Sequence, residues 1–149
     1  QFPLPLIRIA VWLEGITSEW VLVPFVVDTG ATHTCVHPLD ATRLLGMSAA
    51  SLDAATWPRV EASSGIGGGA NYLTTSALYA VMHDDHPTTP PEIITGSIEI
   101  GELTAESQTL PSLLGWDVLQ HFRVTAEWRG QVTLERRASA EAPSVGLPR

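Results

Sequence analysis

The spacing of apolar positions predicts a chain built mostly of β-strands. Ile7, Ile9, Val11 and Leu13 stand at every second position of the first segment, which is the pattern of a half-buried strand. Residues 20–27 are apolar on both faces, which indicates a strand in the middle of the fold. Further strands are expected at residues 32–37, 57–62, 72–82, 93–100, 110–114, 123–128 and 131–136.

Two short segments have a helical pattern instead. In residues 38–46 a proline stands near the start, leucines form an apolar stripe, and Gly46 suits the C-terminal cap. Residues 116–122 predict a second short helix. Many short strands with two small helices indicate one all-β domain over residues 1–137, followed by a disordered tail at residues 138–149.

Composition excludes several classes of protein. The chain has 149 residues, of which 44% are hydrophobic and 16% charged, so it can bury a core. Its net charge is -8 and its eight basic residues are all arginine, without a basic stretch, so we expect no nucleic-acid partner. No apolar run reaches the roughly 18 residues that a membrane span needs. Cys35 is the single cysteine, which excludes an internal disulfide and a four-cysteine zinc site.

The first residues lack the pattern of a signal peptide, because Gln1-Phe2-Pro3 has neither a basic start nor an apolar stretch after it. A chain that begins with Gln1 rather than Met is expected to be a trimmed piece. The compartment therefore stays open.

The strongest candidate for chemistry is the segment Val27-Asp28-Thr29-Gly30. It places a carboxylate in a tight loop directly after an apolar strand, where Gly30 allows the backbone to approach closely. Asp and Gly are also ordinary turn residues, so a plain surface turn is the alternative. The apolar run before Asp28 argues against that alternative.

A second motif follows 85 residues after Asp28, where Leu113-Leu114-Gly115 precedes the second helix. A glycine-rich stretch at Ser63–Asn71 lies between the two motifs, and its tip is expected at Ser64–Ala70. This order resembles the retropepsin-like (retroviral-type) aspartic proteases, and residues 113–122 resemble the cellular and bacterial branch of that family. The resemblance covers roughly residues 6–136.

The resemblance implies a closed β-barrel or sandwich with a flap hairpin, acting as a homodimeric aspartic endopeptidase. One Asp-Thr-Gly per chain is half a site, so the second Asp28 would come from an identical partner. The two carboxylates would share a proton and activate a water molecule. Thr29 would brace the partner's loop, and Gly30 would help to position the substrate backbone. No cofactor is implied.

The resemblance also implies a peptide or protein substrate, bound in a cleft beneath the flap. A flexible surface turn would have the same composition as the flap tip, but its place between the two motifs favours the flap. The residues expected to line the cleft are Ala31, Thr32, His33, Cys35, Gly65, Ile66, Gly67, Gly68 and Leu114.

The chain departs from the viral members of the family at two positions. Thr32 and Trp116 stand where those enzymes carry Asp and Arg, so the ion pair between them cannot form. The chain also continues through a hairpin at residues 123–136, which is a candidate for part of the dimer interface.

His33, Cys35 and His37 alternate along one expected strand and could in principle bind zinc. Ligands from a single strand rarely close a tetrahedral site, so we expect no metal. Two other functions compete with the protease. One is a catalytically silent retropepsin-like module that dimerises and binds peptides, and the other is a plain β-barrel interaction domain. A complete Asp-Thr-Gly favours the enzyme over both.

Overall fold

The computed structural model describes residues 4–65, 68–83, 88–127 and 129–137. Ile66 and Gly67 of the expected flap tip, and the expected tail at 138–149, lie outside these residues. The strands are β1 (Leu6–Leu13), β2 (Val21–Val27), β3 (Cys35–Val36), β4 (Glu61–Gly65), β5 (Gly68–Val81), β6 (Glu92–Gly101), β7 (Leu113–Leu114), β8 (Phe122–Ala126) and β9 (Val132–Arg136). The helices are α1 (Pro38–Arg43) and α2 (Trp116–Leu119), with 3₁₀ turns at Ala49–Leu52, Ala54–Thr56 and Ser107–Thr109.

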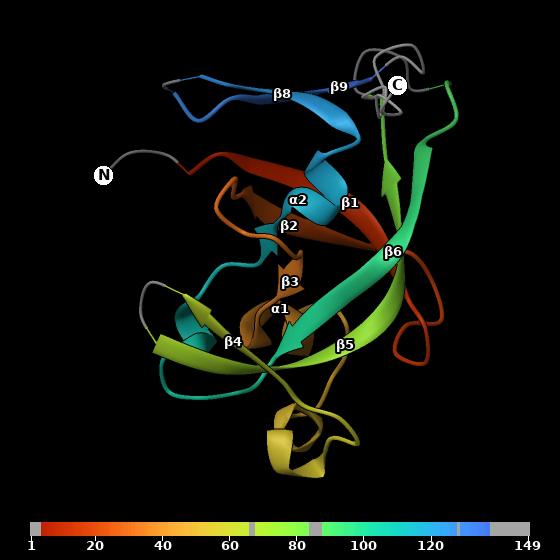
Figure 1. Cartoon of the computed structure of the whole chain (residues 1–149). Coiled ribbons are helices and arrows are strands. Elements are labelled where there is room, and N and C mark those ends of the chain that lie inside the picture. Colours follow the sequence, from red (N-terminus) through yellow and green to blue (C-terminus); the bar gives the residue numbers. More distant parts are fainter. Residues whose placement is uncertain (1–3, 66–67, 84–87, 128, 138–149) are drawn as a thin grey trace, which may run out of the picture.

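Six strands close into a ring. The sheet order is β1-β2-β7-β3-β6-β5-β4, and β1 pairs with β5 as well as with β2. The ring β1-β2-β7-β3-β6-β5 is therefore a closed barrel, and β4 is attached outside it through β5 alone (Figure 1). The sheet is mixed, because β2 runs parallel to β7 and β3 runs parallel to β6. The expected all-β class with two short helices is confirmed.

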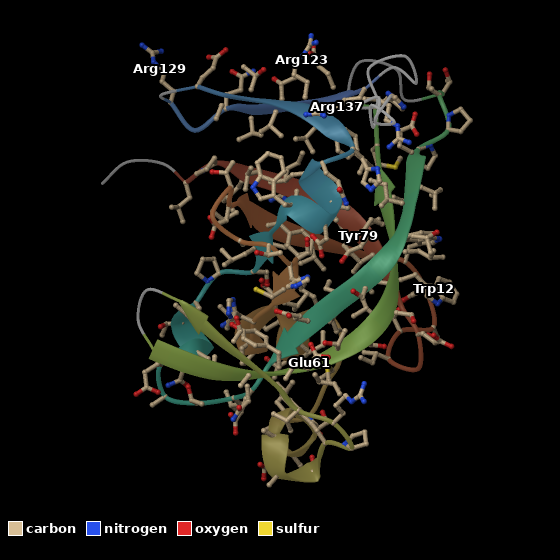
Figure 2. The ribbon with its side chains drawn as sticks, viewed as in Figure 1. Trp12, Glu61, Tyr79, Arg123, Arg129 and Arg137 are labelled. Carbon is tan, nitrogen blue, oxygen red and sulfur yellow. The ribbon has the colours of Figure 1, made fainter. Side chains whose placement is uncertain are left out.

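The barrel interior is filled by the apolar positions that the alternation predicted. Ile9, Val11 and Leu13 of β1 are fully buried, whereas Trp12 on the opposite face is exposed. Tyr79 from β5 lies within the fold (Figure 2), and its hydroxyl donates to the carbonyl of Ser97 at 2.6 Å. The one polar atom of this large buried side chain is therefore satisfied.

Several expected elements are shorter than the pattern suggested. The strand expected at residues 57–62 begins only at Glu61, because the preceding residues form turns. There the Asp53 carboxylate caps a 3₁₀ turn by accepting from the amide of Ala55 at 2.9 Å. The indole of Trp57 donates back to the carbonyl of Ser51 at 2.8 Å. The helices also end early, at Arg43 and Leu119.

The C-terminal strands β8 and β9 form a separate two-stranded sheet, as expected for residues 123–136. In Figure 1 this hairpin lies over β1 and α2. Val124, Val132 and Leu134 pack against the barrel core, while Arg123 and Arg129 lie on the hairpin in Figure 2. In the described part of the chain, no helix is both long and apolar enough to cross a bilayer.

Candidate active site

The loop that carries Asp28 lies between two strands that do not pair with each other. β2 ends at Val27, and β7 separates it from β3 in the sheet. Leu114 is opposite Val27, and its carbonyl accepts from the amide of Asp28 at 3.1 Å. The Leu-Leu-Gly motif thus supports the loop from the neighbouring strand of the barrel, so the structure brings together the two motifs that the sequence separates.

The Asp28 carboxylate is held by its own loop. The amide of Gly30 donates to Oδ1 of Asp28 at 2.8 Å, and the amide of Ala31 donates to the carbonyl of Asp28 at 3.2 Å. Among the described residues, none donates a hydrogen bond to the second carboxylate oxygen. Asp28 is half-buried, whereas Thr29 and Gly30 are exposed. The loop therefore presents one free carboxylate oxygen at an open surface.

The buried Thr34 and the half-buried Asp117 together anchor the far end of the loop. The hydroxyl of Thr34, which is 0% exposed, donates to Oδ1 of Asp117 at 2.6 Å, and its amide donates to Oδ2 at 2.9 Å. The same hydroxyl accepts from the amide of Gly115 at 3.0 Å. The sequence offered no signal for this pair beyond an acid near the start of a helix, because 83 residues separate its members.

Only glycine fits at position 115, because the backbone of the Asp28 loop packs directly against it. A Cβ atom at this position would lie 2.5 Å from the carbonyl carbon of His33 and 3.0 Å from the carbonyl oxygen of Ala31. The backbone amides after it complete the contact, because Trp116 donates to Ala31 at 2.9 Å and Asp117 to Thr32 at 3.1 Å. These bonds explain why the strand expected at 32–37 is reduced to Cys35–Val36: the carbonyls before it bind α2 instead of a neighbouring strand.

The glycine-rich stretch forms the expected hairpin, made of β4 and the start of β5. Its arms remain paired as far as Gly65 opposite Gly68. Glu61, at the base of the β4 arm, is opposite Tyr72 (Figure 2). The Tyr72 hydroxyl lies 3.5 Å from Nε2 of His37, which joins the base of the hairpin to the end of β3. The base of the hairpin is therefore tied to the barrel.

The structure divides the expected cleft residues into two groups. Thr32 and His33 are exposed and Ala31 is half-buried beside Asp28, so these three can reach a ligand. Leu114 is 0% exposed and Cys35 is 4% exposed, so both side chains belong to the packed layer beneath the loop. In the single chain both side chains are therefore covered, and their contact with substrate stays a prediction.

Burial also determines the chemistry of the groups under the loop. Desolvation, reinforced by the negative charges of Glu99, Asp117 and Asp28, raises the pKa of Cys35 to about 12, although a backbone hydrogen bond at Leu113 opposes the rise. A buried thiol with such a pKa stays protonated near neutral pH, which makes it a poor nucleophile. Burial likewise raises the pKa of Glu99, and nearby Glu61 adds to the rise while His33 opposes it.

The expected alternation of His33, Cys35 and His37 does not place three ligands together. His33 lies before β3, and Nδ1 of the buried His37 is 2.6 Å from the carbonyl oxygen of Pro111. Within the described ranges, no group of three His, Cys, Asp or Glu side chains could hold a metal ion.

Comparisons with known proteins complete the description of the site. A scan against protein-family models and a search of curated proteins each gave no match to this chain. Among solved structures, the chain is similar to an EIAV protease complexed with the inhibitor HBY-793, at 16% sequence identity and a TM-score of 0.45. The similarity covers 78% of this chain and 86% of that protease, and it concerns the fold.

Proposed function

We propose that this chain is an aspartic endopeptidase that acts as a homodimer, with one Asp28 from each subunit at the reaction centre. The observation that carries the proposal is the half-buried Asp28 carboxylate. It follows a buried strand, is held through one oxygen by Gly30 at 2.8 Å, and has its second oxygen open. A solvated surface turn has no need of the close support that Leu114 and Gly115 give to this loop.

The chemistry requires two such carboxylates. When they lie close together, both cannot ionise at once, so the pair holds one proton. The charged Asp28 then acts as general base on a water molecule that attacks the peptide carbonyl. The protonated Asp28 donates a hydrogen bond to the carbonyl oxygen and stabilises the developing negative charge.

The arrangement of the loop supports a second copy as the source of the other Asp28. Each chain has one Asp-Thr-Gly, and the neighbouring Thr29 and Gly30 are exposed on the open side of the loop. In a twofold dimer the same open side of each loop would face its copy. The β8–β9 hairpin extends beyond the barrel and would add to this interface.

The substrate would be an extended peptide between the loop and the β4–β5 hairpin. Ala31, Thr32 and His33 would contact its side chains from below. The hairpin residues Gly65, Ile66, Gly67 and Gly68 would close over it from above. Backbone hydrogen bonds give such peptide sites affinity, and side-chain pockets give them specificity.

The test is Asp28→Asn, which preserves the size of the side chain but cannot share the proton. We expect the wild-type chain to cleave members of a peptide library and the variant to lose cleavage while keeping its circular dichroism spectrum. Asp53→Asn is the matched control, because Asn also caps a turn and Asp53 lies far along the chain from the loop. Wild-type turnover in purified Asp28→Asn would refute the assignment. Peptide binding without cleavage by the wild type would instead support the silent module.

A further inference from the structure

The indole of Trp116 is hydrogen-bonded to the tip of the Asp28 loop. Its Nε1–H donates to the carbonyl oxygen of Thr29 at 2.7 Å, across 87 residues of sequence. The side chain is 42% exposed, so the ring is not placed there to fill the core. Its polar atom, in contrast, has a specific backbone partner next to Asp28.

The accepting carbonyl belongs to the same peptide group as the amide that holds the carboxylate. Thr29 supplies the C=O of this group and Gly30 supplies its N–H, which donates to Oδ1 of Asp28 at 2.8 Å. A trans peptide is planar, and its C=O and N–H point in opposite directions. Fixing the carbonyl therefore fixes the direction of the N–H, and each bond polarises the other.

The indole projects from a rigid base. The backbone amide of Trp116 donates to Ala31 at 2.9 Å, on the descending side of the same loop. Gly115 before it is in contact with the His33 backbone, and Asp117 after it binds Thr34. The backbone of Trp116 thus cannot shift easily, and its side chain reaches from the base of the loop to its tip.

We propose that Trp116 is a positioning residue for Asp28: its indole N–H holds the Thr29–Gly30 peptide so that the Gly30 amide keeps one carboxylate oxygen in place. This inference rests on the proposed aspartic protease activity for its catalytic consequence. In the dimer, partner contact at the exposed Thr29 and Gly30 would exclude water from the bond and strengthen it.

The experiment compares Trp116→Phe, which removes the donor, with Trp20→Phe. Trp20 is also 42% exposed, and its ring packs edge-on against Trp12, so it matches Trp116 in exposure but not in hydrogen bonding. A third variant replaces Trp116 with benzothienylalanine, which preserves the bicyclic ring and changes only the N–H to sulfur. Each protein is measured at a concentration where sedimentation shows the same assembly.

We expect the two Trp116 variants to lower kcat by about 3- to 10-fold, the effect of one hydrogen bond, with KM within about 2-fold of wild type. The Gly30 amide resonance should move upfield in both, whereas Trp20→Phe should change neither quantity. A Gly30 resonance that does not move, or a kcat no lower than in Trp20→Phe, would overturn the proposal. If the wild-type chain cleaves no peptide, the proposed function fails, and the Gly30 resonance still decides whether Trp116 holds the loop.

Discussion

Replacing Thr34 with valine should destabilise the protein strongly, although the two side chains have nearly the same shape. The buried Thr34 hydroxyl makes two contacts at the base of the Asp28 loop. It donates to the Asp117 carboxylate at 2.6 Å and accepts from the amide of Gly115 at 3.0 Å. Valine can make neither bond, and because Thr34 and Gly115 are both buried, the Gly115 amide would be left without an acceptor.

The expected loss follows from these two contacts. A hydrogen bond to a charged group contributes about 1.5–3 kcal/mol, and leaving the buried Gly115 amide without an acceptor costs about 1–3 kcal/mol. The added methyl group recovers about 1 kcal/mol of apolar burial. The free energy of unfolding should therefore fall by about 3 kcal/mol.

Urea denaturation followed by circular dichroism measures this change, at one protein concentration because the proposed dimerisation would also contribute to stability. Thr125→Val is the matched control, since Thr125 lies exposed on β8. We expect it to change the unfolding free energy by less than about 0.5 kcal/mol. A loss below about 1 kcal/mol in Thr34→Val, with an unchanged slope in urea, would show that the pair does not anchor the loop.

Three further predictions concern the same region. Gly115→Ala should lower the free energy of unfolding by more than about 2 kcal/mol, because its Cβ would lie 2.5 Å from the His33 backbone, whereas Gly69→Ala, which meets nothing within 4 Å, should not. Cys35 should resist a thiol reagent at pH 8 until the protein is unfolded, because burial raises its pKa to about 12; rapid labelling of the native protein would contradict this. Burial lowers the pKa of His37 below its ordinary 6.5, so the stability from its neutral form is present above pH 6.5 and is lost as the pH falls through the lowered value. Between pH 7.5 and 5 the denaturation midpoint should therefore fall less in His37→Gln than in the wild type. An equal fall in both proteins would show that His37 does not cause the loss of stability.

The sequence predicted those features that depend on local pattern. Alternation at Ile9, Val11 and Leu13 gave the buried face of β1, and the apolar run before Asp28 gave an interior strand that ends in a loop. The barrel and the hairpin came from motif order and resemblance together. The proposed dimer and the cleft residues stay predictions.

The sequence could not reveal contacts between distant segments, because such contacts do not change the spacing of apolar residues. Nothing in the spacing relates Thr34 to Asp117, or the indole of Trp116 to the carbonyl of Thr29. Backbone bonds between the same segments explain why the strand expected at 32–37 is short, because the amides of Trp116 and Asp117 bind the carbonyls before Cys35.

The Asp28 loop is bonded to the barrel on one side and open on the other. On the barrel side, its backbone is hydrogen-bonded to Leu114, Trp116 and Asp117, so this side is complete in one chain. On the other side, Thr29, Gly30 and the second oxygen of Asp28 remain open. A loop that is so firmly fixed on one face and open on the other is suited to meet its own copy, because rigid loops bring two carboxylates together without further ordering. Each chain carries a net charge of -8, so the proposed encounter of two copies would have to overcome a repulsion that salt screens over about 10 Å at 0.1 M. The geometry of the site and the ionic strength of the solution would then jointly control how much active dimer forms.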